Sequence, residues 1–226
     1  MKIGENATGF IKAAAGSPRV HPGEPMKNAA EICSVIDQAE ALKADVLVLP
    51  ELVLSGYTAA DLFLRAPLLE GVLTALECIK DHLKRPESEG LIVVLGAPIR
   101  ADGRLFNCAV FLQNGRVLGI VPKSHLPNYQ EFYEARWFSP ASEAVSSTLE
   151  LLGDTFPFGT DLIFESASGL AIAAEICEDL WVAQPPATAA AAAGANVIVN
   201  LSASNETAGK AKFRRELVRL QSARSM

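Results

Sequence analysis

Four short apolar runs constrain this chain most, because each one stops at or near a residue that can take part in chemistry. The runs and the residues that follow them are 45–50 before Glu51, 116–122 before Lys123, 170–176 before Cys177, and 195–201 shortly before Ser204. Runs of this length, rich in Val and Ile, are typical of buried strands. In open α/β sheets, ligands bind outside the carboxyl ends of the strands. The pattern therefore predicts an α/β fold with a carboxylate, an ammonium and a thiol at one rim.

The segments between these runs predict the remaining elements. Helical spacing of apolar residues indicates helices over 26–44, over 61–83 with a division at Pro67, after Pro186, and over 209–226. Further strands are expected over 10–15, 91–99 and 107–113, and Asn114-Gly115 predicts a hairpin into 116–123. In the last helix we expect Phe213, Leu217 and Leu220 to face inward. Residues 129–160 lack a regular pattern and are expected to form a loop that shapes the site.

Composition excludes several classes of function. The chain has 226 residues, 50% hydrophobic content and a formal net charge of −6, which disfavours nucleic acid as a partner. No apolar stretch reaches transmembrane length, and the first residues lack the pattern of a signal peptide, so we expect a soluble, cytoplasmic protein that binds no membrane. The four cysteines are widely spaced and only three histidines are present, so neither a disulfide scaffold nor a metal site is indicated. We expect Cys33, Cys78 and Cys108 to be packed in the core.

The three rim residues have complementary chemical roles. Cys177 has acidic neighbours in sequence, and nearby negative charge raises the pKa of a thiol. Such a thiol needs a base, and Glu51 can accept its proton. Lys123, together with a backbone N–H after the nucleophile, can stabilise the oxyanion that forms when Cys177 attacks a carbonyl carbon. The product of that attack is a thioester, which water hydrolyses.

Several longer segments carry a family resemblance. PELVLSGYTAADLF, VPKSHLPNYQEFYE, FGTDLIF, EICEDLW and NLSASNE occur in this order along the chain. The segments around Glu51, Lys123 and Cys177 resemble the three signature segments of the nitrilase superfamily of carbon–nitrogen hydrolases. In more detail, all five resemble the amino-terminal glutaminase domain of glutamine-dependent NAD⁺ synthetases, from about Phe10 to the last residue.

This resemblance implies a fold and a set of site residues. The fold is an α/β sandwich of the αββα nitrilase type. The family's Glu–Lys–Cys triad maps onto Glu51, Lys123 and Cys177, and its supporting second glutamate maps onto Glu134. The substrate-binding positions that match are Tyr57, Trp181 and Ser204, with Lys210 as a weaker match. The implied reaction is hydrolysis of the side-chain amide of glutamine, with the ammonia passing to a synthetase domain that amidates nicotinic acid adenine dinucleotide.

The chain departs from the family pattern in two respects. The synthetase domain with its SGGxDS phosphate loop is absent, so no cofactor is expected here, and ATP and Mg²⁺ are expected only for that missing domain. The family's fold normally continues past residue 226, so we expect an incomplete sandwich, truncated at its carboxyl end, over residues 10–226. Residues 1–9 are interpreted as a flexible start or a tag remnant. Members of the superfamily commonly associate through their sandwich faces, so a homo-oligomer is expected.

Two alternatives remain open from the sequence. The first is a stand-alone nitrilase-type amidase that acts on another amide. The second is an inactive, truncated domain that mediates assembly. The intact triad argues against an evolved loss of activity, although it does not exclude a loss caused by truncation.

Overall fold

The computed structural model describes residues 10–166 and 169–225, so the predicted flexible start at residues 1–9 lies outside the described residues. Its larger sheet has five strands in the order β1-β2-β3-β4-β5, with β1–β3 parallel and β3–β5 antiparallel. These strands are β1 (Ala13–Ala15), β2 (Val46–Val48), β3 (Ile92–Ala101), β4 (Arg104–Gln113) and β5 (Arg116–Pro122). The parallel half places the end of β2 at the edge of the sheet where the site forms.

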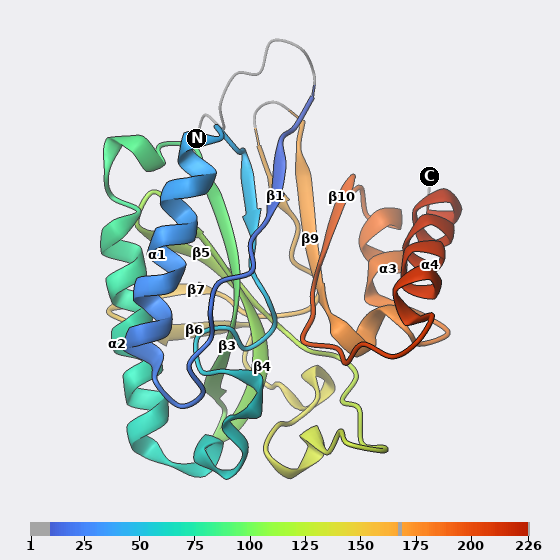
Figure 1. Ribbon diagram of the computed structural model, residues 1–226, viewed down its shortest axis with the longest axis horizontal. Coiled ribbons are helices and arrows are strands. Elements are labelled where there is room, and N and C mark those ends of the chain that lie inside the picture. Colours follow the sequence, from blue (N-terminus) through green and yellow to red (C-terminus); the bar gives the residue numbers. More distant parts are fainter. Residues whose placement is uncertain (1–9, 167–168, 226) are drawn as a thin grey trace.

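Two parallel helices cover the outer face of this sheet (Figure 1). They are α1 (Pro25–Ala41) and α2 (Ala66–His82). Pro67 stands in the first turn of α2, where its missing N–H costs nothing, and the preceding segment forms a 3₁₀ turn, η1 (Tyr57–Leu64). The predicted division at Pro67 is therefore confirmed. The apolar faces of both helices pack on the sheet in one large core.

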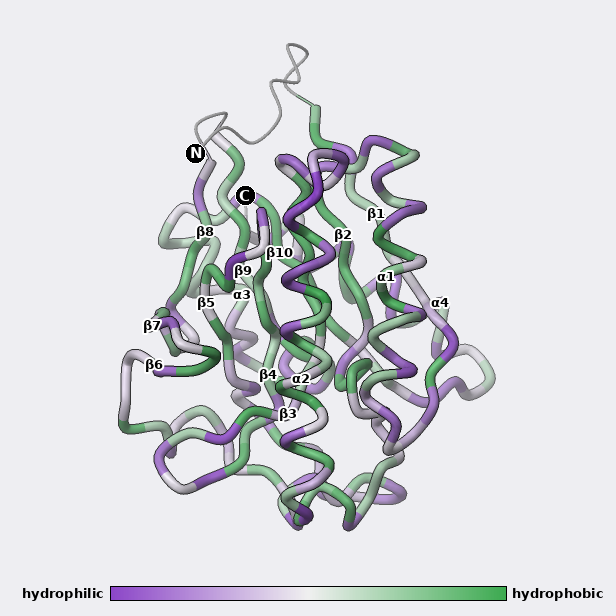
Figure 2. The backbone as a smooth tube through the Cα atoms, turned by 90° about the vertical axis from the view of Figure 1, so that its left-hand side faces the viewer, coloured by the Kyte–Doolittle hydropathy of each residue, from purple (hydrophilic) through white to green (hydrophobic). Residues whose placement is uncertain are grey.

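A second, smaller sheet stacks on the inner face of the first. It contains β8 (Phe164–Glu165), β9 (Ala171–Ile176) and β10 (Val197–Leu201), in the order β10-β9-β8 with β9 and β10 parallel. Between the sheets lies a core that includes Val94, Phe111, Ile172 and Ile176. Figure 2 shows apolar residues running along the strands of both sheets. Helices α3 (Pro186–Ala192) and α4 (Lys210–Arg224) lie on the outer side, which completes the αββα order of layers (Figure 1).

Turn chemistry explains the hairpin between β4 and β5. Asn114 and Gly115 both have positive φ, as a type I′ turn requires, and they join β4 to β5 as predicted. The segment 129–160 is less irregular than predicted, because it contains the hairpin β6 (Thr148–Leu151) and β7 (Asp154–Pro157). The remaining 3₁₀ turns are η2 (Pro86–Ser88), η3 (Glu134–Arg136), η4 (Ala141–Glu143) and η5 (Cys177–Leu180).

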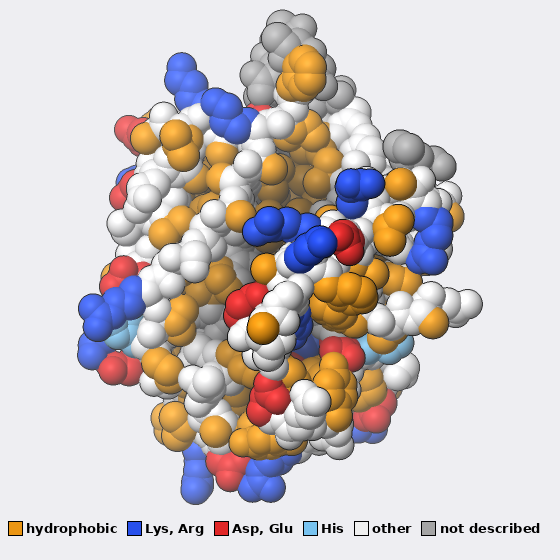
Figure 3. All heavy atoms as spheres, turned by 45° about the vertical axis from the view of Figure 1, so that its right-hand side comes forward, with side chains coloured by type: hydrophobic (Ala, Val, Ile, Leu, Met, Phe, Trp, Pro, Cys, Tyr) orange, Lys and Arg blue, Asp and Glu red, His pale blue; other side chains and the backbone are white. Residues whose placement is uncertain are grey.

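Two predictions about packing are wrong. Phe213 and Leu220 of α4 do not face a core, since they are 56% and 65% exposed, whereas Leu217 is half-buried. Helical spacing shows which residues share a face, but it does not show whether another element covers that face, and on this side basic and apolar side chains lie together at the surface (Figure 3). Cys78 is also exposed, although Cys108 is buried as expected and Cys33 is half-buried against the core.

Candidate active site

Glu51 lies in a tight turn that begins three residues after the end of β2. Its neighbour Leu52 has a positive φ of 50°, and the turn presses against β3 at Gly96. A Cβ on Gly96 would stand 2.2 Å from the backbone nitrogen of Leu52, so only glycine permits this approach. The amide of Gly96 donates to the carbonyl of Pro50 at 3.2 Å, which ties the turn to the sheet. The Glu51 side chain is thereby held in the interior, where it is fully buried.

Lys123 follows β5 and is completely buried between two carboxylates. Its ammonium donates to Oε1 of Glu51 at 2.6 Å and to Oε1 of Glu134 at 2.7 Å. Burial alone would lower the pKa of Lys123, but the two carboxylates outweigh it and the pKa is raised, so the side chain is charged. Burial, and then the charge of Glu51, raise the pKa of Glu134, while Lys123 opposes that shift.

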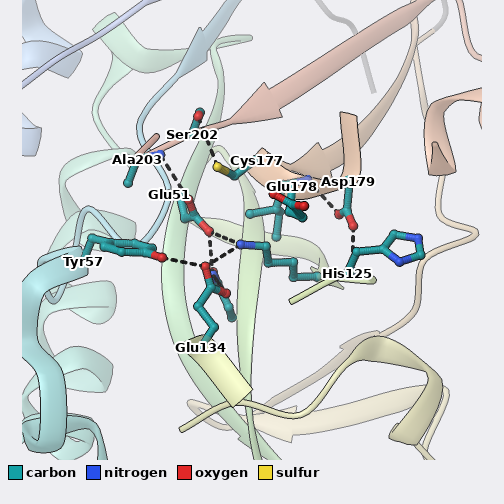
Figure 4. Close-up of polar contacts among 12 residues, drawn as sticks. Glu51, Tyr57, His125, Glu134, Cys177, Glu178, Asp179, Ser202 and Ala203 are labelled. Carbon is teal, nitrogen blue, oxygen red and sulfur yellow. Dashed lines mark hydrogen bonds and ion pairs between the residues drawn. The ribbon is translucent and has the colours of Figure 1, made fainter. Parts of the chain in front are cut away.

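Cys177 begins η5 directly after β9, and its φ of 46° places the backbone in the left-handed region. The turn presents the thiol next to the Glu51 carboxylate (Figure 4). Ser202, just after β10, donates its hydroxyl to Sγ at 3.4 Å, and the adjacent Ala203 N–H donates to Oε2 of Glu51 at 3.0 Å. Burial, and then Glu51, raise the pKa of Cys177 to about 12, whereas Lys123 and Ser202 lower it. The resting thiol is therefore protonated at neutral pH.

Two buried residues and one half-buried residue, all missed by the sequence reasoning, hold this cluster together. Asp179 accepts hydrogen bonds from the backbone N–H groups of Ile176 at 3.0 Å and His125 at 2.8 Å, so it connects the Cys177 turn to the segment after β5. Asn107 of β4 donates a hydrogen bond to Glu51 at 2.8 Å. The third residue is Ser202, whose hydroxyl donates to the Cys177 thiol. Asp179 and Ser202 lay inside quoted motifs, EICEDLW and NLSASNE, whereas Asn107 lay outside them. The His125 ring points away from the cluster (Figure 4).

The predicted substrate-binding residues occupy two places. The Tyr57 hydroxyl donates to Glu134 at 2.8 Å, so it belongs to the buried cluster. Ser204 and Trp181 lie further out and meet at Lys210, whose ammonium donates to the Ser204 hydroxyl at 2.7 Å and stands 5.3 Å from the centre of the Trp181 ring. The Ser204 N–H donates to the Ser202 hydroxyl at 3.3 Å. A continuous strip of polar contacts thus runs from the thiol to a lysine at the periphery.

Other features of the described residues lie apart from this cluster. A cavity of about 420 Å³ lies between the second sheet and α4, where Glu175, Asn200 and Gln221 are among its lining residues. The buried Glu175 has a structural role, since its carboxylate accepts hydrogen bonds from the Ala187 N–H in the first turn of α3 and from the Asn200 side chain. Over residues 10–166 and 169–225, no group of three His, Cys, Asp or Glu side chains is arranged to hold a metal ion. Within the same ranges, no helix is long and apolar enough to cross a membrane.

The layered fold, with a glutamate, a lysine and a cysteine at the strand ends, defines a hydrolase of the nitrilase superfamily. Comparison with known proteins agrees with this class. The family model for carbon–nitrogen hydrolases matches residues 12–226. The chain therefore belongs to the carbon–nitrogen hydrolase family.

Individual relatives show which proteins of this family the chain resembles. The glutamine-dependent NAD(+) synthetase of Mycobacterium bovis is 43% identical over 223 residues, which cover 96% of this chain and 32% of that protein. A crystal structure of a glutamine-dependent NAD(+) synthetase from Cytophaga hutchinsonii superposes with a TM-score of 0.78 at 30% identity, covering 92% of this chain and 33% of that one. The predicted resemblance to these synthetases is confirmed, and the chain spans about a third of their length.

A further structure confirms the fold alone. An amidase from Nesterenkonia sp. superposes with a TM-score of 0.68 at 18% identity, covering 89% of this chain and 68% of that protein. The predicted αββα architecture of the nitrilase type is therefore confirmed by the layers observed here and by these neighbours.

Proposed function

We propose that this chain hydrolyses the side-chain amide of glutamine, with Cys177 as nucleophile and a thioester as intermediate. The observation that supports this most strongly is the buried cluster in which Lys123 joins Glu51 and Glu134 beside the Cys177 thiol. A protonated thiol next to a buried carboxylate is suited to general-base activation, because proton transfer and attack can occur in one step.

In the first half of the proposed reaction, Sγ of Cys177 bonds to the amide carbon while its proton moves to Glu51. The negative charge that develops on the amide oxygen is stabilised by Lys123 and by a backbone N–H at the start of η5, since the first N–H groups of a helix have no partner within it. The tetrahedral intermediate then collapses. Glu51 returns the proton to the leaving nitrogen, which departs as ammonia and leaves the acyl group on sulfur.

In the second half, water takes the place that ammonia has left. Glu51 removes a proton from this water as its oxygen attacks the thioester carbon, and the same two donors stabilise the new oxyanion. Collapse breaks the carbon–sulfur bond, returns the proton to Cys177 and releases glutamate. Glu134 acts through Lys123 in this scheme, because its carboxylate fixes the ammonium at 2.7 Å and is itself held by Tyr57.

Glutamine is favoured over simpler amides by the polar strip outside the cluster. Lys210 stands at its outer end, linked to Ser204 and lying over the Trp181 ring. A cation at the outer end of a polar strip that begins at the nucleophile suits the α-carboxylate of glutamine, whereas a simple aliphatic amide has no charge to place there. The names of the relatives, glutamine-dependent NAD(+) synthetases, agree with this choice. In the proposal, the ammonia serves a synthetase segment of the kind those longer relatives carry.

The test measures ammonia release from glutamine by the chain and by its Cys177→Ala variant, with Cys78→Ala as a matched control at an exposed cysteine. We expect release to vanish in Cys177→Ala and to persist in Cys78→Ala. Retention of the full rate by Cys177→Ala would show that the nucleophile is assigned wrongly. A panel of glutamine, asparagine, simple amides and nitriles separates the glutaminase from a general amidase. A chain that is inactive on all of them, although folded, would favour an assembly role.

A further inference from the structure

Polar contacts hold α1 in a fixed register against the end of α2 and the residues that follow it. His82 lies 2.9 Å from the carboxylate of Asp37, and Arg85 donates to Glu40 at 3.0 Å. Each of these pairs is separated by 45 positions in the sequence. Because both residue numbers increase together, the helices run parallel, and one helical turn before Asp37 and His82 the same register brings another pair face to face.

That pair consists of two free cysteines, Cys33 on α1 and Cys78 on α2. Cys33 is half-buried and Cys78 is exposed. The two thiols lie close enough for Cys78 to influence the ionisation of Cys33, as the register predicts. Neither thiol contributes to the cluster around Cys177, which lies on the other side of the larger sheet from these helices (Figure 1). The catalytic proposal therefore leaves this pair unexplained.

We propose that Cys33 and Cys78 form a redox-modification site that a low-molecular-weight disulfide, such as glutathione disulfide, converts into a disulfide between α1 and α2. Residues that face each other across two packed helices at the same register are placed so that their sulfurs can join without a change of fold. The resulting bond closes a long chain segment that includes β2, the Glu51 turn and most of α2. Closure of such a loop restricts the unfolded chain.

The reaction proceeds by two thiol–disulfide exchanges. The exposed Cys78 thiol meets the oxidant first, and its sulfur displaces one glutathione, which leaves with the proton that Cys78 loses. The Cys33 sulfur then attacks the Cys78 sulfur of the mixed disulfide and displaces the second glutathione, which takes the Cys33 proton. Glutathione disulfide gains the two electrons that the protein thiols lose. Burial, and then the neighbouring Cys78 and Asp37, raise the pKa of Cys33 to about 11, so little of this thiol is ionised at neutral pH.

The experiment treats the whole chain with glutathione disulfide in a Cys177→Ala background, so that the catalytic thiol cannot react. Intact mass and non-reducing peptide mapping then identify the products. We expect a species lighter by two hydrogen atoms, with the peptides of Cys33 and Cys78 linked, and an increase in the urea midpoint that dithiothreitol reverses. A Cys33→Ser variant is expected to stop at one glutathione on Cys78, and a Cys78→Ser variant is expected to react far more slowly.

Two results would overturn the proposal. One is a chain that keeps glutathione on Cys78 without closing the bond, which would show that Cys33 lies out of reach. The other is a chain in which both thiols stay free by mass while added glutathione disulfide is consumed elsewhere. The decisive measurement is made on a chain that keeps both Cys33 and Cys78, so the test does not depend on a variant of these residues that folds poorly. It is also independent of glutaminase activity.

Discussion

Replacing Lys123 by methionine tests the buried cluster, because it removes the one positive charge between two buried carboxylates. The ammonium is fully buried and bonded to Glu51 at 2.6 Å and to Glu134 at 2.7 Å, and both partners are at most 1% exposed. Methionine has a similar length and no charge. The variant therefore keeps the volume of the side chain and leaves two carboxylates facing each other in the interior.

The expected magnitude follows from this burial. Removing one partner of a buried ion pair costs about 3–5 kcal/mol, because the remaining charge is left without compensation. That loss is a large part of the total stability of a domain, about 5–15 kcal/mol. A double variant, Lys123→Met with Glu134→Gln, is expected to recover part of the loss, since only one buried carboxylate then remains.

Urea unfolding followed by circular dichroism provides the measurement. Lys84→Met is the matched control, since its ion pair with Asp81 lies at the surface, where both side chains are 62% exposed, and its midpoint should not move. Equal midpoints for wild type and Lys123→Met would refute the reasoning about the cluster.

The pH dependence supplies a second signature of the same variant. Burial and Glu51 already raise the pKa of Glu134, and loss of Lys123 removes the group that opposes this shift. A carboxyl group whose pKa is raised in the folded state favours its neutral form there, so stability is lost as the pH rises above the unfolded value of about 4.3. The destabilisation of Lys123→Met should therefore be smaller at pH 5 than at pH 8. An equal loss at both values would contradict the electrostatic explanation.

Three further predictions follow from individual contacts. Ser202→Ala removes a hydrogen bond to Cys177, so alkylation of that thiol by iodoacetamide should slow by about 2- to 10-fold at fixed pH. Peptide mass follows the reaction, and an unchanged rate would show that Ser202 does not influence the Cys177 thiol. Gly96→Ala drives a Cβ into the backbone of the turn after β2 and should lower both the urea midpoint and ammonia release, while Gly71→Ala, which makes an ordinary contact, should lower neither. Lys210→Met should raise KM for glutamine by about tenfold and leave hydrolysis of uncharged amides unaltered, and an equal effect on both substrates would exclude contact with the carboxylate.

The sequence was most informative where strands end in reactive residues. The apolar runs before Glu51, Lys123 and Cys177 predicted that these residues share a rim, and in the structure they come together in one buried cluster. Parallel pairing of β2 with β3 and of β9 with β10 brings two of these strand ends to the site. The motif segments also indicated Glu134.

The contacts between side chains could not be predicted in the same way. Asn107 lies inside an ordinary strand pattern and Ser202 directly follows another, and only the pairing of distant strands brings them to Glu51 and Cys177. The exposure of Cys78 depends on how α1 and α2 pack, which helical spacing along one helix does not specify. The short arms of the β6–β7 hairpin carry too few residues for a clear alternation.

The most direct test of the central claim is the mass of the chain after brief mixing with glutamine and quenching in acid. If Cys177 is the nucleophile that the buried glutamate and lysine serve, its peptide should carry an acyl group equal in mass to glutamine less ammonia. The adduct should be absent from Cys177→Ala. Steady release of ammonia with the acyl group on another residue, or with undiminished release by Cys177→Ala, would contradict the account.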